Sequence, residues 1–398
     1  FEQVFNKTDL NITSTGGTVY LKKGGHVHSG VVNLADSTLC TGGTLIIESG
    51  NAFDASSDIE IMEDAEITMN EALTFDKLKL NDKALTIGAG SQNVVFLGLA
   101  GDKIDNEYEK LITKDTNVTI QSGFSVSAGS IESQAAGTLK FSGPVSLSGS
   151  GTIGITGGGN LKFDGTSTLA GGDFNAAGAT IEVNSQVTLG ATTISAISPP
   201  TLWEVNSASL VIASNFVGSS LGGNINLNSG IIDLDKDISF GTVTMSGESS
   251  VNTTGIGSAP FQAILGIPAA SVFTVPADCN PCNYTGFVLS GGKLAVSGNA
   301  IVTSLTYSAD STTDIKSGKS LTVTNAIDVS NVSTKKLNLY GTGTLKLQNP
   351  PTVQDNGELK TELTSLEITG NITLSGTNRK ISSTSGIIAI SGTTTLGA

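Results

Sequence analysis

Aromatic and charged residues are both scarce in this sequence. Of its 398 residues, 5% are aromatic, with Trp203 the single tryptophan, and 14% are charged, compared with about 25% in average globular proteins. Valine, isoleucine and leucine are nevertheless frequent and evenly spread, which argues against a disordered chain. A core of small and branched aliphatic side chains suits thin, regular layers better than a bulky globule.

Basic residues are scarce as well. Arg379 is the only arginine, and 21 basic against 35 acidic residues give a net charge of −14. The chain lacks the positive footprint that nucleic acid and anionic membranes require, so we expect no nucleic-acid partner. No run of 18 apolar residues occurs, so we expect no membrane span. The acidity, with a first residue Phe1 rather than Met, favours a secreted protein at the cell surface or in the extracellular space.

The sequence has only three cysteines, Cys40, Cys279 and Cys282. Two residues separate the last two, a spacing that allows a local disulfide, free thiols or a metal pair. No second pair of this kind completes a zinc site, and the flanks VPAD and NYTG do not indicate the strand-to-helix junction of a redox motif. We therefore favour a disulfide between Cys279 and Cys282, with the fate of Cys40 left open.

The only two histidines, His26 and His28, alternate along an expected strand and would lie on one face of it. Such a pair can bind metal, but no third ligand is indicated. With so few histidines, a Ser-His-Asp triad is disfavoured. Polysaccharide-cleaving enzymes need paired carboxylates and usually aromatic clefts, for which the composition offers little support. We predict no catalytic residues and no cofactor.

Three acidic residues, Asp233, Asp235 and Asp237, are spaced like the start of a calcium-binding loop. Such a loop needs glycine at its sixth position and glutamate at its twelfth. Ile238 and Thr244 occupy those positions here. The three aspartates are therefore weak metal candidates, and a solvated acidic strand is the preferred interpretation.

Short alternating strands recur about every 20 to 22 residues. Aligned copies read GTLKFSGPVSLSG at 137–149, GNLKFDGTSTLAG at 159–171 and ATIEVNSQVTLGA at 179–191. A fixed period near 20 predicts stacked repeats, and period-2 alternation broken by Gly, Ser and Asn predicts β-structure. The expected inward ladder consists of Leu139, Phe141, Leu161, Phe163, Ile181 and Val183.

The predicted fold is therefore an all-β, parallel β-solenoid (a β-helix) of roughly 14–17 coils. Leucine-rich repeats share the period, but their fixed LxxLxL pattern is absent. An antiparallel sandwich is the alternative, and it would need hairpin turns at nearly every strand end. Only Asp164-Gly165 and Asn356-Gly357 offer such turns.

Three stretches interrupt the repeat: 102–114, 196–204 with its proline pair and Trp203, and 256–288. In the expected domain organisation, residues 1–15 are an N-terminal arm or cap, and residues 16–255 are solenoid. Within that solenoid, residues 102–114 have the spacing of a helix, with Asp102 as its N-cap. Residues 256–288 are richer in proline, contain both members of the cysteine pair, and are expected to leave the solenoid, which continues over 289–398.

The stretches GTLKFSGPVSLSGSG at 137–151 and GTGTLKLQNPPTV at 341–353 resemble the loose repeats of autotransporter passengers and related bacterial β-helix surface proteins. The resemblance extends over much of 16–398. It implies an extracellular, adhesin-like parallel β-helix, either a passenger released from the rest of its protein or a free-standing secreted subunit.

The last repeat, SGTTTLGA, has no atypical polar turn of the kind that normally caps a repeat protein. An uncapped coil invites heterologous head-to-tail contacts, which make filaments when they do not close. We expect a non-enzymatic structural protein that self-associates into a filament or surface layer. The alternative is a monomeric adhesin that binds glycan or a host surface through 256–288; a polysaccharide-active enzyme and an ice-binding protein are less favoured.

Overall fold

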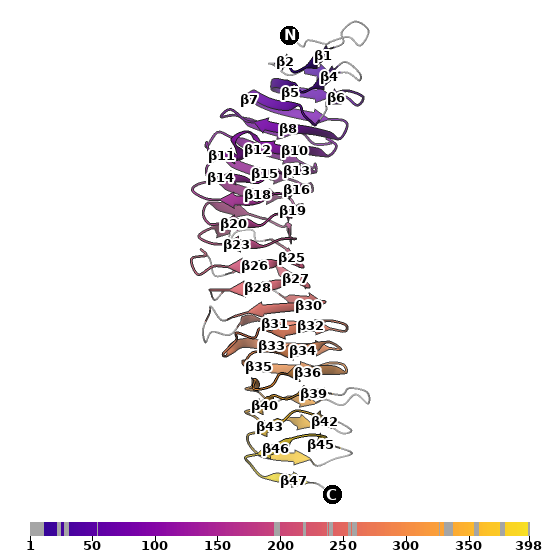
Figure 1. Ribbon diagram of the computed structural model, residues 1–398, viewed down its shortest axis with the longest axis vertical. Helices are drawn as coiled ribbons and strands as arrows, with labels where there is room; N and C mark the ends of the chain where they lie inside the picture. Colours follow the sequence, from indigo (N-terminus) through magenta and orange to yellow (C-terminus); the bar gives the residue numbers. More distant parts are fainter. Residues whose placement is uncertain are drawn as a thin grey trace. The chain divides into compact units, whose positions relative to one another are not determined.

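The computed structural model is all-β, with strands that stack in successive layers (Figure 1). It describes residues 12–21, 25–27, 32–53, 55–194, 200–217, 220–236, 238, 242–253, 256, 261–325, 327–329, 337–353, 358–374 and 379–396. Helical structure there is limited to short 3-10 turns such as η1 (Ala100–Asp102).

The strands form a parallel β-solenoid of about 16 turns, as the repeats predicted. Register is kept from coil to coil: Leu139 pairs with Leu161, which pairs with Ile181. The paired strands that the structure describes run parallel throughout, which excludes the antiparallel sandwich.

The chain divides into two compact units, 1–203 with 215–218 and 204–214 with 219–398. The division falls beside Trp203. Strand β25 (Leu202–Asn206) contains the division.

Unit 1 contains three sets of parallel strands. The largest comprises β2 (Thr18–Leu21), β3 (Gly25–Val27), β5 (Thr38–Ile47), β7 (Asp58–Met69), β8 (Leu73–Lys79), β9 (Ala84–Ile87), β10 (Val94–Leu99), β12 (Lys110–Lys114), β13 (Val118–Ile120), β15 (Ser130–Gln134), β16 (Thr138–Phe141), β18 (Thr152–Thr156), β19 (Asn160–Phe163), β21 (Asp173–Asn175), β22 (Thr180–Val183) and β24 (Thr193–Ile194). The second comprises β11 (Lys103–Ile104), β14 (Phe124–Val126), β17 (Val145–Leu147), β20 (Ser167–Leu169) and β23 (Val187–Leu189). The third comprises β1 (Ile12–Thr15), β4 (Val32–Ala35) and β6 (Ala52–Phe53).

Unit 2 repeats the arrangement. One set comprises β27 (Asn224–Asn228), β29 (Val243–Ser246), β31 (Phe261–Pro268), β33 (Cys282–Ser290), β35 (Ala300–Tyr307), β37 (Ser320–Val323), β40 (Thr344–Leu347), β43 (Ser365–Ile368) and β46 (Ile387–Ile390). The other comprises β26 (Ser209–Ile212), β28 (Ile231–Leu234), β30 (Glu248–Asn252), β32 (Val272–Val275), β34 (Lys293–Val296), β36 (Ser311–Ile315), β39 (Leu337–Gly341), β42 (Glu358–Thr361) and β45 (Lys380–Ser383). Two short pairs join β38 (Asp328–Val329) to β41 (Thr352–Val353) and β44 (Ile372–Leu374) to β47 (Thr394–Leu396).

The few aromatic side chains are concentrated in stacks inside the coils. In unit 1, Phe141 contacts Phe163 with ring centroids 5.5 Å apart, and Phe163 contacts Phe174 at 6.3 Å. All three rings are fully buried. Since a parallel ladder places equivalent side chains directly above one another, each ring adds both apolar burial and ring contact to the next coil.

Polar side chains on the outer surface also form ion pairs and hydrogen bonds with the neighbouring coil. Lys140 Nζ lies 2.8 Å from Asp164 Oδ2, and at the turns asparagine oxygens accept from the backbone of the next coil. Thr138 N donates to Asn117 Oδ1 over 3.0 Å, and Thr393 N donates to Asn371 Oδ1 over 2.7 Å. The outer surface therefore reinforces the same register as the core.

The expected helix over 102–114 is wrong. The segment contains β11 and β12, and its apolar side chains Ile104 and Leu111 are buried from two different strands. Asp102 has φ 52°, whereas an N-cap residue takes the extended region. The spacing that suggested a helix arises because two short strands are joined by a turn that carries Tyr108.

The expected excursion at 256–288 is also wrong for its described part. Strand β31 pairs with β29 and β33, and β32 pairs with β30 and β34, so the ladder runs through this segment. Residues 1–11 of the expected N-terminal arm lie outside the described chain. Residues 12–15 form β1, which pairs in parallel with β4.

We predict that Phe163→Ala lowers the free energy of unfolding by about 3–5 kcal/mol, because it removes a fully buried ring between two others. Urea unfolding followed by circular dichroism measures the change. Thr168→Ala, at an exposed position in the adjacent β20, is the control and should change stability by less than about 0.5 kcal/mol. A loss below about 1 kcal/mol for Phe163→Ala would contradict the role given to the ring stack.

Candidate functional site

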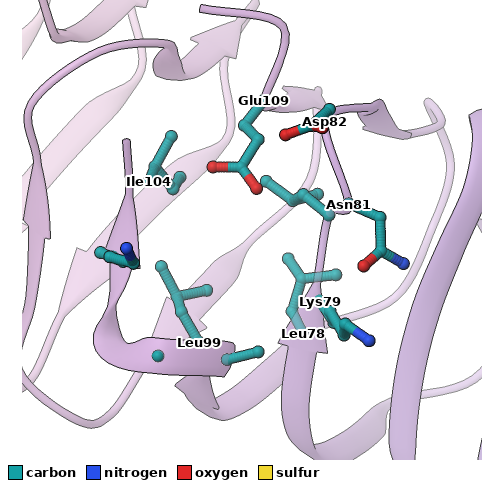
Figure 2. A pocket seen from close by; sticks show the side chains of 11 residues that line it. Leu78, Lys79, Asn81, Asp82, Leu99, Ile104 and Glu109 are labelled. Atoms are coloured by element: carbon teal, nitrogen blue, oxygen red, sulfur yellow. The ribbon is translucent and has the colours of Figure 1, made fainter. Parts of the chain in front are cut away.

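An open cavity of about 470 Å³ lies in unit 1 between the end of β8 and the turn that holds η1 (Figure 2). A second depression of about 920 Å³ adjoins it and shares Asp82. We call the two together the Asp82 groove. Its lining residues are Glu63, Asp64, Leu78, Lys79, Leu80, Asn81, Asp82, Lys83, Ala84, Leu99, Ala100, Gly101, Lys103, Ile104, Glu107, Tyr108, Glu109 and Lys110.

The groove arises from one lengthened coil. Ala84 pairs with Lys110, a step of 26 residues, whereas Lys110 pairs with Ser130, a step of 20. Part of the difference lies in the loop between β11 and β12, since Ile104 and Lys110 are six residues apart (110 − 104) whereas their partners Val126 and Ser130 are four apart (130 − 126). Because the ladder fixes the strands on both sides, the extra chain is placed at the surface and leaves a depression beside it.

Left-handed backbone shapes both edges of the groove. Asn81 and Asp82 have φ 52° and 59° on one side, and Asp102 has φ 52° on the other. Asparagine and aspartate tolerate this region better than other residues with a Cβ. The turns therefore bend sharply while presenting polar side chains at the rim.

One wall of the groove is held by the carboxylate of Glu60, which accepts hydrogen bonds from two side chains. Glu60 Oε1 lies 2.8 Å from Lys79 Nζ and 2.9 Å from Asn81 Nδ2. The hydrogen bond from Lys79, followed by that from Asn81, holds the pKa of Glu60 below its ordinary value. The same interaction with Glu60 raises the pKa of Lys79. Lys79 is therefore engaged and fixed, not a mobile cation.

The opposite wall is the loop between β11 and β12. Lys103 pairs with Asp105, and Asp105 N donates to Glu109 Oε2 over 3.2 Å. Figure 2 shows the Glu109 carboxylate directed into the cavity, between Ile104 and Asp82. Tyr108 is 63% exposed, and its hydrogen bond to Glu107 raises the pKa of the phenol.

Donors and acceptors are balanced along the groove. Four lysines and five carboxylates line it, over a floor that includes Leu78, Leu99 and Ile104, each 1% exposed. Among the residues that the structure describes, no three histidine, cysteine or acidic side chains are grouped so that they could hold a metal ion. The chemistry present is hydrogen bonding and apolar contact.

The histidine candidates fall elsewhere. His26 Nε2 lies 2.6 Å from Glu48 Oε1, and Asn70 Nδ2 donates to Glu48 Oε2 over 2.9 Å. These three side chains form a polar ladder across successive coils. His28 lies outside the described residues, so the structure does not place the two imidazoles together.

The aspartate candidates lie in unit 2. Asp233 is half-buried in β28 and Asp235 is exposed just beyond it, while Asp237 lies outside the described residues. Burial, followed by the nearby charges of Asp235 and Asp278, raises the pKa of Asp233. Among the described residues, these carboxylates belong to no group of three His, Cys, Asp or Glu side chains that could hold a metal ion.

The structure joins Cys279 and Cys282 in a disulfide with a Cα–Cα distance of 4.9 Å, the pairing that the sequence favoured. Both residues are buried at a corner of the solenoid. Cys40 is a buried thiol in β5 and donates to Glu60 Oε2 over 3.7 Å. It therefore belongs to the network behind the Lys79 wall.

Comparison with known proteins gives no relative from which a function could be transferred: no family model, curated protein or solved structure matches the chain. Over the described residues, none of the helical segments has the length and apolar character needed to cross a membrane.

The Asp82 groove could not be predicted from the sequence, because most residues of one wall lie in 102–114, the segment that was expected to be a helix. Two signals pointed to turns instead. Asn81-Asp82 and Gly101-Asp102 each follow an alternating strand, and these residue types favour left-handed turn positions.

We predict that Glu60→Gln lowers stability only where Glu60 is ionised. Because the folded pKa lies below the ordinary value of 4.5, the stabilisation is fully present above pH 4.5 and disappears as pH falls through the folded pKa. The pair is partly exposed, so the difference near pH 7 should be about 1 kcal/mol or less. Urea unfolding at pH 3, 4, 5 and 7 measures it.

Glu248→Gln is the matched control, since Glu248 is exposed in β30 and forms no ion pair with another described residue. Its effect on stability should not depend on pH in this way. If the stability lost through Glu60→Gln increases as the pH falls, the trend is opposite to the expected one and refutes the lowered pKa of Glu60.

Proposed function

We propose that this protein is a non-enzymatic, extracellular structural protein that self-assembles end to end through its solenoid coils into a filament or surface layer. The observation that carries the proposal is the parallel ladder of coils within each unit. Where no cap or further chain covers it, the end of such a stack presents unpaired backbone donors and acceptors.

The outermost described coil of unit 2 illustrates such an edge. Strand β46 pairs with β43, so that Ile388 lies beside Leu366. Leu366 is fully buried between coils, whereas Ile388, at the equivalent inward position with no described coil beyond it, is half-buried. A further coil placed there would bury apolar side chains and pair the backbone, and in the proposed assembly a second copy supplies that coil.

The charges on the lateral faces of the coils favour contacts between copies through their ends over side-by-side packing. Some of these charges are matched within the chain, as in Lys162 with Glu182 at 2.9 Å and Lys346 with Glu367 at 3.6 Å. The remaining net charge of −14 opposes side-by-side packing of identical chains. A heterologous contact at the ends repeats without closing, which is the geometry of a filament.

The buried disulfide supports the extracellular part of the proposal. Disulfides persist in oxidising compartments and are rare in the cytosol. The pair Cys279–Cys282 is enclosed at a corner of the solenoid, where it fixes the turn before β33.

The burial of aromatic side chains weighs against the alternative, an adhesin that binds through 256–288. The aromatic side chains of that segment, Phe261, Phe273, Tyr284 and Phe287, are buried in the core. Tyr284 donates its hydroxyl to Val251 O over 2.8 Å. These rings support the coils and are not available to a ligand.

We predict that the purified chain forms fibres in physiological salt, with an axial repeat of one subunit, and that Ile388→Asp prevents them. The substitution places a charge at the edge where the next coil would stack. Electron microscopy and light scattering as a function of protein concentration measure assembly. The expected effect is a rise of at least about tenfold in the concentration needed for fibres, corresponding to about 1.4 kcal/mol per contact.

Ile231→Asp is the matched control, because Ile231 is an exposed isoleucine on a lateral strand of the same unit. It should assemble as the parent chain does. Dispersed single subunits of the parent chain at high concentration would overturn the proposal, as would fibres that Ile388→Asp leaves unchanged.

A further inference from the structure

We propose that the Asp82 groove binds an uncharged oligosaccharide, with Tyr108 as the ring on which one sugar stacks. The inference is independent of end-to-end assembly, because the groove lies on a lateral face of unit 1.

Charge balance indicates an uncharged ligand. The groove is lined by four lysines and five carboxylates, and the lysines of its inner part are already paired within the chain, Lys79 with Glu60 and Lys103 with Asp105. Along much of this surface, a polyanion would be repelled by the carboxylates and a polycation by the lysines. A polyhydroxyl compound donates and accepts at every hydroxyl, so it can use carboxylates, amides and ammonium groups together.

Tyr108 supplies the apolar contact. It is among the most exposed large apolar side chains of the described chain, at 63%, and it stands at the rim among Glu107, Asp82 and Lys110. Its hydroxyl has the Glu107 carboxylate as a hydrogen-bond partner, which raises the pKa of the phenol. An aromatic ring with an apolar face and a polar edge matches a sugar ring, whose faces are C–H and whose rim is hydroxyl.

The size and rigidity of the groove fit a short chain of sugars. Its two depressions measure about 470 and 920 Å³, comparable to small-ligand sites of about 300–1,000 Å³. Polar groups stand on turns fixed by the ladder, and Asn81, Asp82 and Asp102 hold left-handed conformations that cluster at ligand sites. A preorganised rim loses little entropy when a flexible saccharide binds.

The test titrates the full chain with cellotetraose, chitotetraose and mannotetraose, with tetragalacturonate and tetralysine as charged probes, by calorimetry and ligand-observed NMR. We expect at least one neutral tetrasaccharide to bind with a Kd of about 1 mM or tighter. Affinity should change by less than about twofold between 0.05 and 0.5 M salt, because no net charge is involved.

Tyr108→Ala should weaken binding about tenfold, whereas Tyr108→Phe, which keeps the ring, should stay within about threefold. Tyr340→Ala is the matched control, since Tyr340 is a 37%-exposed tyrosine of unit 2 and its loss should leave the affinity unchanged. Thermal unfolding checks that each variant is folded, which the exposure of both side chains favours.

Three results would overturn the proposal. The first is no binding by any of the three neutral tetrasaccharides at 10-fold the expected Kd. The second is tighter binding of tetragalacturonate or tetralysine, which would indicate an acidic glycan or a basic peptide. The third is binding that Tyr108→Ala does not weaken, which would place the sugar elsewhere. None of these results depends on whether the chain forms fibres.

Discussion

The parallel register between successive coils is the constraint on which the rest of the structure depends. A shift of one residue in any strand would exchange its inward and outward faces. Leu139, Leu161 and Ile181 would then leave the core together with the rings of Phe141 and Phe163. The core ladder, the ion pairs and the asparagine contacts at the turns all require the same register, so each reinforces the others.

The period of this register could be predicted from the sequence because it is local and repeated. Copies such as GTLKF and GNLKF show the alternation, the glycine breaks and the step between coils. The cysteine pair followed from spacing and elimination. The errors occurred where one coil differs from its neighbours. Ile104, Tyr108 and Leu111 have helical spacing, yet Ile104 and Leu111 belong to separate strands and Tyr108 to the turn between them.

The expectation that 256–288 leaves the solenoid fails for a related reason. Proline and a close cysteine pair usually mark a loop, but here the pair sits at a corner, and the strands on each side continue the ladder. Pairing with strands about 20 residues away along the chain determines where these strands form, more than their own composition does. The Asp82 groove was invisible for the same reason, since Ala84 and Lys110 are neighbours only in the folded coil.

A solenoid can carry a binding site at small structural cost because its coils are nearly independent modules. The lengthened coil between Ala84 and Lys110 leaves both adjacent registers intact: β12 still pairs with β9 on one side and with β15 on the other. A loop of different length or sequence at that position would change the groove without changing the core. The ladder thus separates the two demands on the chain, since buried aliphatic residues maintain the stack while the residues at its corners are free to acquire a ligand.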